Sequence, residues 1–339
     1  MPERSAGAVS CVCCGEGMVL RWAGLFDDRY GHPGRFDLYC CARCGHGQTV
    51  PMLREEDLPE LYGRYYPRSE VDVDALRRQV GDPGSAEARR RRWREGTDNQ
   101  GQYATRPGMK VLDYGCGTGV SLLEIQALGG EAYGIEADPN VRPVAEALGL
   151  RIHFGSLDDD PFPGERFDLI VLNQVLEHIP DPLGLLGRLR ERLAPGGRLI
   201  LSFPNAASFY ARLFGRRWIN WHVPYHLHHF TRRSCRELFR RGGWRVRQLR
   251  TITPNLWTVL QCRAAAAPAR HGSPHPLWTG SREGGGAEEP QGWRRWLERT
   301  AVGAGRPVPA ALLTALNRTL DAAGAGDSLL VEVVPGSDG

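Results

Sequence analysis

The segment VLDYGCGTG, residues 111–119, constrains the fold of this chain more than any other stretch. An apolar run ends here in three alternate glycines, Gly115, Gly117 and Gly119, and a helical pattern follows. Such glycines allow a tight turn and bring backbone amides close to a ligand at the start of a helix. A nicotinamide-binding loop of the form G-x-G-x-x-G would need glycine where Val120 stands. The segment therefore predicts a strand, a turn that binds a different ligand, and a helix.

Strand patterns alternate with helical patterns from this segment to the end of the chain. Stretches such as 121–130 and 183–197 carry apolar residues at helical spacing and end in Gly-Gly, which is typical of a helix stop. Strands are expected at 110–114, 131–135, 151–154, 167–172, 198–203, 244–252 and 328–334. This alternation predicts an α/β fold in which a mostly parallel, seven-stranded sheet has helices on both faces.

Three regions are expected along the chain: a zinc-binding module at 1–52, a helical linker or lid at 53–100, and the α/β domain at 101–339. Residues 86–95 (AEARRRRWRE) predict an arginine-rich helix, and a charge run on a helix is usually a solvated face. Residues 264–291 are rich in Ala, Gly, Pro and charge, which predicts a flexible insertion without a packed core.

Six of the nine cysteines lie in two groups near the N-terminus, CVCCG and CCARCG. They contain two Cys-x-x-Cys pairs with 26 residues between them: Cys11, Cys14, Cys41 and Cys44. Two such pairs present four thiolates to one tetrahedral Zn(II), and the glycine after each pair lets the backbone turn. Because four thiolates leave no open coordination position, we expect a structural zinc ribbon. Cys13 and Cys40 are spare, and either can shift the set of ligands.

Several motifs together point to a family. Asp113 stands two residues before the first glycine of the loop, and the segments GIEADP, NQVLEHIPDP and LAPGGRLILSFPN follow in order. With these motifs, residues 103–335 resemble the class I S-adenosylmethionine-dependent methyltransferases. The resemblance implies an enzyme with a Rossmann-like methyltransferase sheet and with S-adenosyl-L-methionine as its cofactor.

The resemblance also assigns cofactor contacts to the ends of successive strands. Glu136 ends the second strand, where the family's acid accepts both ribose hydroxyls. Ser156 stands where family members often have an acid, so backbone groups of Ser156 and Leu157, or the side chain of Asp158, are the alternatives for the adenine contact. The other implied contacts are Asp113, Gly115, Cys116, Gly117, Gly119, Ala137 and Asn173.

Four of the ten histidines lie within NWHVPYHLHHFT, residues 220–231: His222, His226, His228 and His229. In the family, the chain crosses the acceptor pocket at this point. A metal site here would need a carboxylate or a third histidine in a geometry that the sequence does not show. The alternatives are a general base or acceptor-orienting role for His226, or for His178 in LEHIP, a metal site, and structural hydrogen bonding. Histidine has the pKa range for deprotonating a hydroxyl near neutrality.

Composition narrows the classes of partner. A net charge of +4 gives weak support for a nucleic-acid partner. The motif [DNS]-P-P-[YFW] of enzymes that methylate base amines is absent, because Asn173 is followed by Gln-Val-Leu. No apolar run reaches the roughly 18 residues that span a bilayer, and the N-terminus lacks the apolar core of a signal peptide. We therefore expect a cytoplasmic enzyme with no membrane contact.

The closer resemblance is to bacterial methyltransferases that combine N-terminal Cys-x-x-Cys pairs with the phrases LEHIPDP, SFPN and PYHLHHFT. It implies a small-molecule acceptor, a sugar nucleotide or a specialised metabolite of a biosynthetic pathway, methylated at O, N or C. Two alternatives stay open. One is an RNA methyltransferase that grips phosphates with its zinc ribbon and arginine helix, and the other is a non-catalytic binding module that keeps the cofactor fold.

Overall fold

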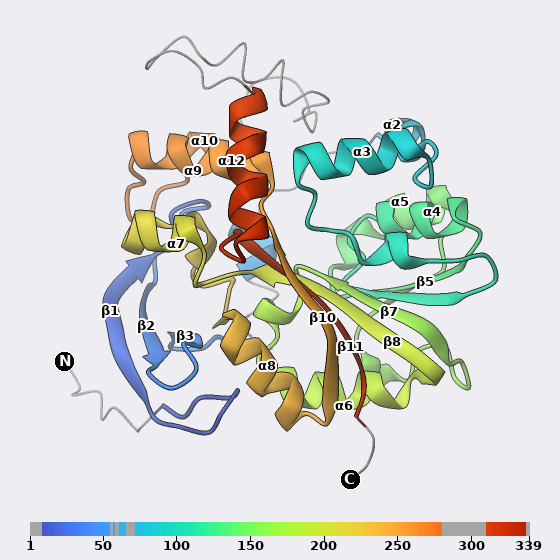
Figure 1. The fold of residues 1–339 in the computed structure, drawn as a ribbon, viewed down its shortest axis with the longest axis horizontal. Helices are drawn as coiled ribbons and strands as arrows, with labels where there is room; N and C mark the ends of the chain where they lie inside the picture. Colours follow the sequence, from blue (N-terminus) through green and yellow to red (C-terminus); the bar gives the residue numbers. More distant parts are fainter. Residues whose placement is uncertain (1–8, 55–56, 58–60, 66–71, 280–309, 337–339) are drawn as a thin grey trace.

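The computed structural model describes residues 9–54, 57, 61–65, 72–279 and 310–336. Most of these residues form a layered α/β unit, in which one seven-stranded sheet has helices on both faces (Figure 1). A smaller four-stranded sheet, built mainly from the N-terminal residues, lies beside it (Figure 1). The predicted α/β fold with a seven-stranded sheet is therefore confirmed.

The large sheet has the strand order β10-β11-β8-β7-β4-β5-β6. Its strands are β4 (Lys110–Tyr114), β5 (Glu131–Glu136), β6 (Ile152–Phe154), β7 (Phe167–Asn173), β8 (Leu193–Pro204), β10 (Trp244–Ile252) and β11 (Ser328–Pro335). All neighbours are parallel except that β11 runs antiparallel to both β8 and β10. The carboxyl ends of five adjacent parallel strands thus share one edge, which is where open α/β sheets bind ligands.

Helices cover both faces of the large sheet, with α6 and α8 on the side opposite α4 and α5 (Figure 1). The α-helices are α2 (Val73–Val80), α3 (Ala86–Glu95), α4 (Val120–Ala127), α5 (Arg142–Leu148), α6 (Pro182–Glu191), α7 (Phe209–Phe214), α8 (Arg232–Arg241), α9 (Asn255–Ala266), α10 (Pro276–Thr279) and α12 (Ala310–Ala322). Shorter helical turns are η2 (Leu61–Tyr65), η3 (Gly101–Ala104), η4 (Pro139–Val141), η5 (Leu157–Asp159), η6 (Leu176–His178), η7 (Gly215–Arg217) and η8 (Ile219–Trp221). Side-chain caps explain several helix starts: Ser85, Asp181 and Thr231 each accept a backbone N–H of the first turn.

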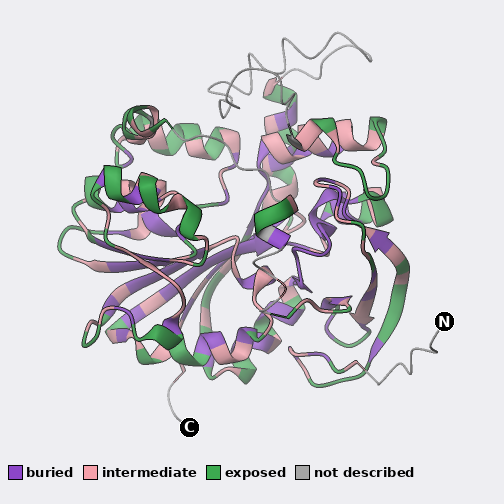
Figure 2. Cartoon of the chain, turned by 180° about the vertical axis from the view of Figure 1, so that it is seen from behind, coloured by how far each residue is buried: buried purple, intermediate pink, exposed green. Residues whose placement is uncertain are grey.

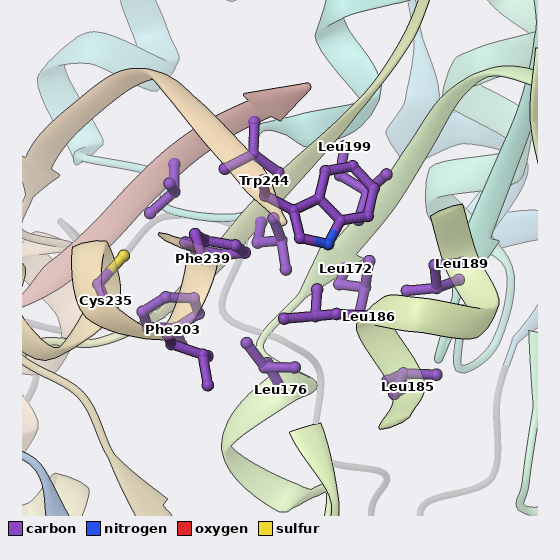
Figure 3. Packing of buried hydrophobic residues seen from close by; sticks show 14 of the residues in the cluster. Leu172, Leu176, Leu185, Leu186, Leu189, Leu199, Phe203, Cys235, Phe239 and Trp244 are labelled. Carbon is purple, nitrogen blue, oxygen red and sulfur yellow. The ribbon is translucent and has the colours of Figure 1, made fainter. Parts of the chain in front are cut away.

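The main core lies between the large sheet and helices α6 and α8 (Figure 3). Strand β7 (FDLIVLN) is nearly continuously buried, as expected for a central strand covered on both faces. Apolar side chains from its neighbours and from the two helices complete the cluster: Leu199, Phe203, Leu185, Leu186, Leu189 and Phe239. Figure 2 shows the same division, with buried residues along the strands and exposed residues on the outer faces of the helices.

Leu186→Ala is expected to lower the free energy of unfolding by about 2–5 kcal/mol. Leu186 is fully buried in α6, so the shorter side chain leaves a cavity against the sheet. Urea denaturation followed by circular dichroism measures the change. Leu213→Ala in α7 is the matched control, because this leucine is 61% exposed and should change stability by about 0.5 kcal/mol or less. Equal losses of unfolding free energy in the two variants would contradict the packing of Leu186 against the sheet.

The prediction for residues 183–197 is wrong at its end. Helix α6 stops at Glu191, and β8 begins at Leu193, so Gly-Gly lies inside a strand and does not mark a helix stop. Leu193 pairs with Phe167 of β7. A Cβ atom on Gly197 would lie 2.8 Å from the Phe167 carbonyl oxygen, so glycine here permits close approach of the two strands.

The small sheet joins the N-terminal residues to the histidine-rich segment. Its strands are β1 (Met18–Phe26), β2 (Arg35–Cys41), β3 (Gly47–Val50) and β9 (His228–His229), in the order β1-β2-β3-β9. Neighbouring strands are antiparallel, and β9 pairs with β3 through Gly47 opposite His229 and Gln48 opposite His228. The proposed zinc module and the proposed α/β domain therefore share one sheet.

The segment expected to be a flexible insertion begins with ordered structure. Residues 264–266 end α9, and α10 follows at Pro276–Thr279. His275 donates its backbone N–H to the Arg29 carbonyl at 2.8 Å, and the Arg29 guanidinium lies 4.4 Å from the Trp278 ring. Residues 280–291 lie outside the described part of the chain. Within that described part, no helix is long and apolar enough to cross a bilayer.

Candidate functional site

The glycine loop lies at the carboxyl end of β4 and leads into α4. Gly115, Gly117 and Gly119 all have positive φ, at 78°, 54° and 86°. A Cβ atom on Gly115 would lie 2.6 Å from a methyl of Val175, and one on Gly119 would contact Leu150. A Cβ atom on Gly117 would have no atom of the described residues within 4 Å, so within that part of the chain this glycine borders open space. The loop therefore leaves room for a ligand over Gly117.

Two carboxylates flank the loop. Glu136, the last residue of β5, accepts the Gly117 N–H at 2.7 Å and the Asp138 N–H at 2.8 Å. Asp113 is buried and accepts a hydrogen bond from the Ser121 hydroxyl. Its other carboxylate oxygen is buried without a hydrogen-bond partner among the described residues. Burial raises the pKa of Asp113 to about 7.

The segment expected on the adenine side lies against the end of β5. Gly155 donates its backbone N–H to the Glu136 carbonyl at 2.9 Å, which places Ser156 and Leu157 next to Glu136 and Ala137. The Ser156 hydroxyl accepts the Asp158 N–H at 3.1 Å, and the Asp159 carboxylate accepts the Ser156 N–H at 2.8 Å. Leu157 is buried and Asp158 is exposed. Cys116 lies beneath the loop in a second apolar cluster, which includes Leu122 and Ile125 of α4.

Asn173 ends β7 and binds a segment that the sequence did not mark as part of the site. Its side-chain amide donates to Gln102 at 3.0 Å, and its amide oxygen accepts the Gly101 N–H at 3.3 Å. Gln102 and Tyr103 in turn donate to Glu124 of α4, at 2.8 and 2.7 Å. A Cβ atom on Gly101 would clash with Val171, so glycine lets η3 lie against β7. The short phrase GQYA carries no motif that could have revealed this contact.

The four histidines of residues 220–231 are all buried, but they do not share one side of a strand. Residues 223–225 form a turn and His226 lies outside β9, so His226 and His228 do not belong to one continuous strand. His228 shares a 3.2 Å hydrogen bond with His46, and His229 shares one of 3.0 Å with Thr49. Both bonds lead into the N-terminal module, which indicates a structural function for these two rings.

His226 lies instead against His178 and His222. The His178 and His226 rings meet edge to face, with centroids 4.8 Å apart, and the His222 and His226 centroids are also 4.8 Å apart. The Nδ1 atom of His226 donates to the Asn220 carbonyl at 2.9 Å, and Nδ1 of His178 donates to the Tyr225 carbonyl at 2.9 Å. Burial lowers the pKa of His178 to about 4 and holds the pKa of His226 well below its ordinary value. Both rings are therefore neutral at pH 7.

The two Cys-x-x-Cys pairs meet in the N-terminal module. The Sγ atoms of Cys11 and Cys44 lie 3.5 Å apart, and those of Cys14 and Cys41 lie 3.4 Å apart. All four sulfurs lie within 4.8 Å of one another, which fits a tetrahedral zinc whose ligand sulfurs are about 3.8 Å apart. Cys40 is half-buried, and its sulfur lies 4.0 Å from Arg21. The predicted four-thiolate set is thus brought together, and it is compatible with zinc.

The match to known proteins lies in the α/β part of the chain. Residues 85–249 match the family model described as Methyltransferase domain. These residues belong to the methyltransferase domain family. A ubiquinone biosynthesis O-methyltransferase from Cereibacter sphaeroides is 35% identical over 133 residues, which are 37% of this chain and 54% of that protein. The chain therefore spans about half the length of this curated relative.

Two further proteins resemble the methyltransferase domain. A ribosomal protein L11 methyltransferase from Thermus thermophilus is 45% identical over 104 residues, which are 29% of this chain and 39% of that protein. A solved S-adenosylmethionine-dependent methyltransferase from Mesorhizobium loti is 17% identical, with a TM-score of 0.41 over 75% of this chain and 99% of that one.

The residues at the carboxyl edge of the methyltransferase domain fit S-adenosyl-L-methionine. The open space over Gly117 accommodates a ligand, and the carboxylate of Glu136 faces the same loop. The Asp113 oxygen that has no hydrogen-bond partner among the described residues supplies a further acceptor beneath it. Asn173 and Gln102 add polar groups from the next strand and from η3. Ser156 and Leu157 border the adjacent strand end.

Proposed function

We propose that this chain is an S-adenosylmethionine-dependent methyltransferase that acts on a small-molecule acceptor. The observation that supports this most directly is the pairing of Glu136 with the open glycine loop at the carboxyl edge of five parallel strands. The acceptor that we propose is a sugar nucleotide or a specialised metabolite. The name of the ubiquinone biosynthesis O-methyltransferase supports oxygen as the methylated atom, while nitrogen and carbon remain the alternatives.

The cofactor supplies an electrophilic methyl group, and the chain's own residues hold the reactants in line. In this proposal Glu136 accepts the ribose hydroxyls, and the amides of the glycine loop contact the methionine part. Asp113, Cys116 and Asn173 line the same side of the pocket. Ala137, Ser156 and Leu157 enclose the adenine.

The acceptor side of the proposed site is the pair His178 and His226. His178 belongs to η6, which follows β7 by two residues, and η6 thus leaves the same edge of the sheet as the glycine loop. The side chain of Val175, just before η6, contacts Gly115. We propose that His226, with His178 as the alternative, orients or deprotonates the acceptor.

The proposal is tested by isothermal titration calorimetry with S-adenosylmethionine, followed by turnover assays over a panel of sugar nucleotides and phenolic metabolites. We expect saturable heat with one cofactor per chain, and S-adenosylhomocysteine release with a subset of acceptors. Absence of any heat would favour a non-catalytic module that has kept the fold.

His226→Ala is expected to lower the turnover number by about 100-fold or more, because proton transfer by a positioned group contributes about that much. The dissociation constant for S-adenosylmethionine should change by less than about twofold. Steady-state kinetics and calorimetry measure the two quantities separately. His271→Ala is the control, since this exposed ring bonds to the Pro33 carbonyl and lies outside the histidine pair. An unchanged turnover number for His226→Ala would remove this residue from the mechanism.

The arginine-rich helix α3 uses two of its arginines within the chain, which leaves fewer of them to bind RNA. Arg89 and Arg92 donate to the carbonyls of Gly84 and Pro83, and the Arg92 guanidinium lies 3.6 Å from the centre of the Tyr103 ring. These two side chains are therefore used within the chain. An RNA enzyme would bind RNA with a steep salt dependence. Gel shifts over a salt series are expected to show no such binding.

A further inference from the structure

A carboxylate stands beside the histidine pair that the sequence did not connect with it. Ligand atoms of Glu177, His178 and His226 all lie within 4.8 Å of one another. Glu177 and His178 come from η6, while His226 comes from the turn before β9. A 2.8 Å hydrogen bond from the Leu227 N–H to the Glu177 carbonyl fixes the two segments together. The three side chains therefore form one cluster held by the backbone.

Glu177 is 1% exposed, and neither of its carboxylate oxygens has a hydrogen-bond partner among the described residues. A buried carboxylate without a partner is costly, so such groups are normally paired or bind a metal. The two histidines are close enough to share an ion with Glu177 but do not hydrogen-bond to it. The geometry thus fits a ligand held among the three side chains.

Both imidazole rings are oriented as metal ligands usually are. In each, Nδ1 donates to a backbone carbonyl, Tyr225 for His178 and Asn220 for His226, both at 2.9 Å. This hydrogen bond fixes the tautomer that carries its hydrogen on Nδ1, so Nε2 is the ring nitrogen that would bind a metal. Backbone carbonyls are common partners of the second ring nitrogen in metal sites.

We propose that Glu177, His178 and His226 bind one divalent transition-metal ion. Two imidazoles and one carboxylate suit Zn(II), Fe(II) or Co(II), and three protein ligands leave positions open for a further ligand. The site is separate from the four-thiolate cluster, whose ligands are Cys11, Cys14, Cys41 and Cys44.

The fixed charges around the cluster are compatible with a cation. Asp98 is a second buried carboxylate whose field acts on Glu177. It accepts from Ser328 at 2.7 Å and from Gln174 at 3.2 Å. Arg29 is the nearby positive charge, and its guanidinium is tied to the Ile219 carbonyl at 2.7 Å. When Glu177 and Asp98 are ionised, the two carboxylates outweigh the one guanidinium, so the surroundings attract a cation.

The function of this ion rests on the proposed methyl transfer. An acceptor hydroxyl on an open position would lose its proton to solvent more easily, because a bound metal lowers the pKa of its oxygen ligand. The oxygen would then form a bond to the methyl carbon of the sulfonium, and the electron pair of the broken carbon–sulfur bond would go to sulfur. His226 and His178 would then orient the acceptor through the ion and would not themselves remove its proton, which is the first of the two roles proposed for them.

Metal content of the purified full chain tests the site. Mass spectrometry of bound metals is expected to show about one ion fewer per chain in Glu177→Gln and in His226→Gln than in the native protein. His222→Gln is the matched control, because His222 touches His226 but lies outside the cluster, and its metal content should be unchanged. Equal metal content in the native protein and Glu177→Gln would overturn the proposal.

A second measurement uses only the native protein, so it does not depend on the folding of any variant. Co(II) added to protein that holds one zinc ion per chain, in the four-thiolate cluster, is expected to give weak visible ligand-field bands that saturate at one equivalent, without the intense charge-transfer bands of thiolate ligands. Absence of a saturable band would overturn the site.

Chelation is a third test. Turnover should fall at least tenfold after mild chelation and return with Zn(II) or Co(II). If the metal binds to this cluster but S-adenosylmethionine does not bind to the chain, the metal site stands and the proposed function fails. If methyl transfer proceeds with no ion at Glu177, His178 and His226, the proposed function stands and the metal site fails.

Discussion

Cys41→Ser is expected to remove about one zinc ion per chain and to lower the free energy of unfolding by at least about 3 kcal/mol. Structural zinc contributes roughly 10–16 kcal/mol of apparent binding free energy in small zinc modules, and loss of one thiolate forfeits much of it. Cys41 ends β2 and is fully buried, with its sulfur 3.4 Å from that of Cys14. Metal analysis and thermal denaturation measure the two effects.

The neighbouring Cys40→Ser is the matched control for this result. Cys40 lies on the same strand, but its sulfur contacts Arg21 and is outside the four-sulfur cluster. Zinc content should therefore stay unchanged in Cys40→Ser. Full zinc content in Cys41→Ser would mean that Cys13, buried beside Cys11 and Cys44, has replaced a predicted ligand. Because β3 pairs with β9, we also expect loss of zinc to disturb the histidine-rich segment.

Glu136→Ala is expected to weaken S-adenosylmethionine binding by about 100-fold or more. Two hydrogen bonds to a charged carboxylate contribute about 1.5–3 kcal/mol each, and each 1.4 kcal/mol is roughly tenfold in affinity. The same carboxylate holds the Gly117 N–H at 2.7 Å, so its loss also loosens the glycine loop. Isothermal titration calorimetry measures the dissociation constant.

Glu131→Ala supplies the control for Glu136→Ala. Glu131 begins the same strand and is exposed at the opposite edge of the sheet. Its removal should leave cofactor affinity within about twofold of the native value. Comparable losses in the two variants would show that Glu136 acts only through the stability of β5, and would remove the proposed ribose contact.

Local patterns were sufficient to predict most of the large sheet. The segments KVLDY and WRVRQLRTI coincide with β4 and β10, because short apolar or alternating runs bounded by turn residues have few other stable conformations. The start of β8 was missed for a related reason. Gly196 and Gly197 fit a helix stop locally, and only the approach of Gly197 to Phe167 explains why they lie in a strand.

The boundary between the regions could not be predicted from sequence. The proposed zinc module and the methyltransferase domain were expected as successive units, yet β9 from the second completes the sheet of the first. A two-residue strand has no pattern of its own, and its pairing depends on where the rest of the chain places it. The contact of η3 with Asn173 has the same origin, since it joins residues about 70 positions apart.

By itself, the sequence determined the glycine loop, Glu136 at the end of β5, and the four zinc-compatible thiolates. Each depends on spacing along a short segment or on a repeated motif. Only the tertiary structure decided the environment of His226. It paired His228 and His229 with the N-terminal module and set His226 against Glu177 and His178. The physical reason is that these side chains lie about 48 residues apart, and their meeting depends on the packing of η6 against the turn before β9.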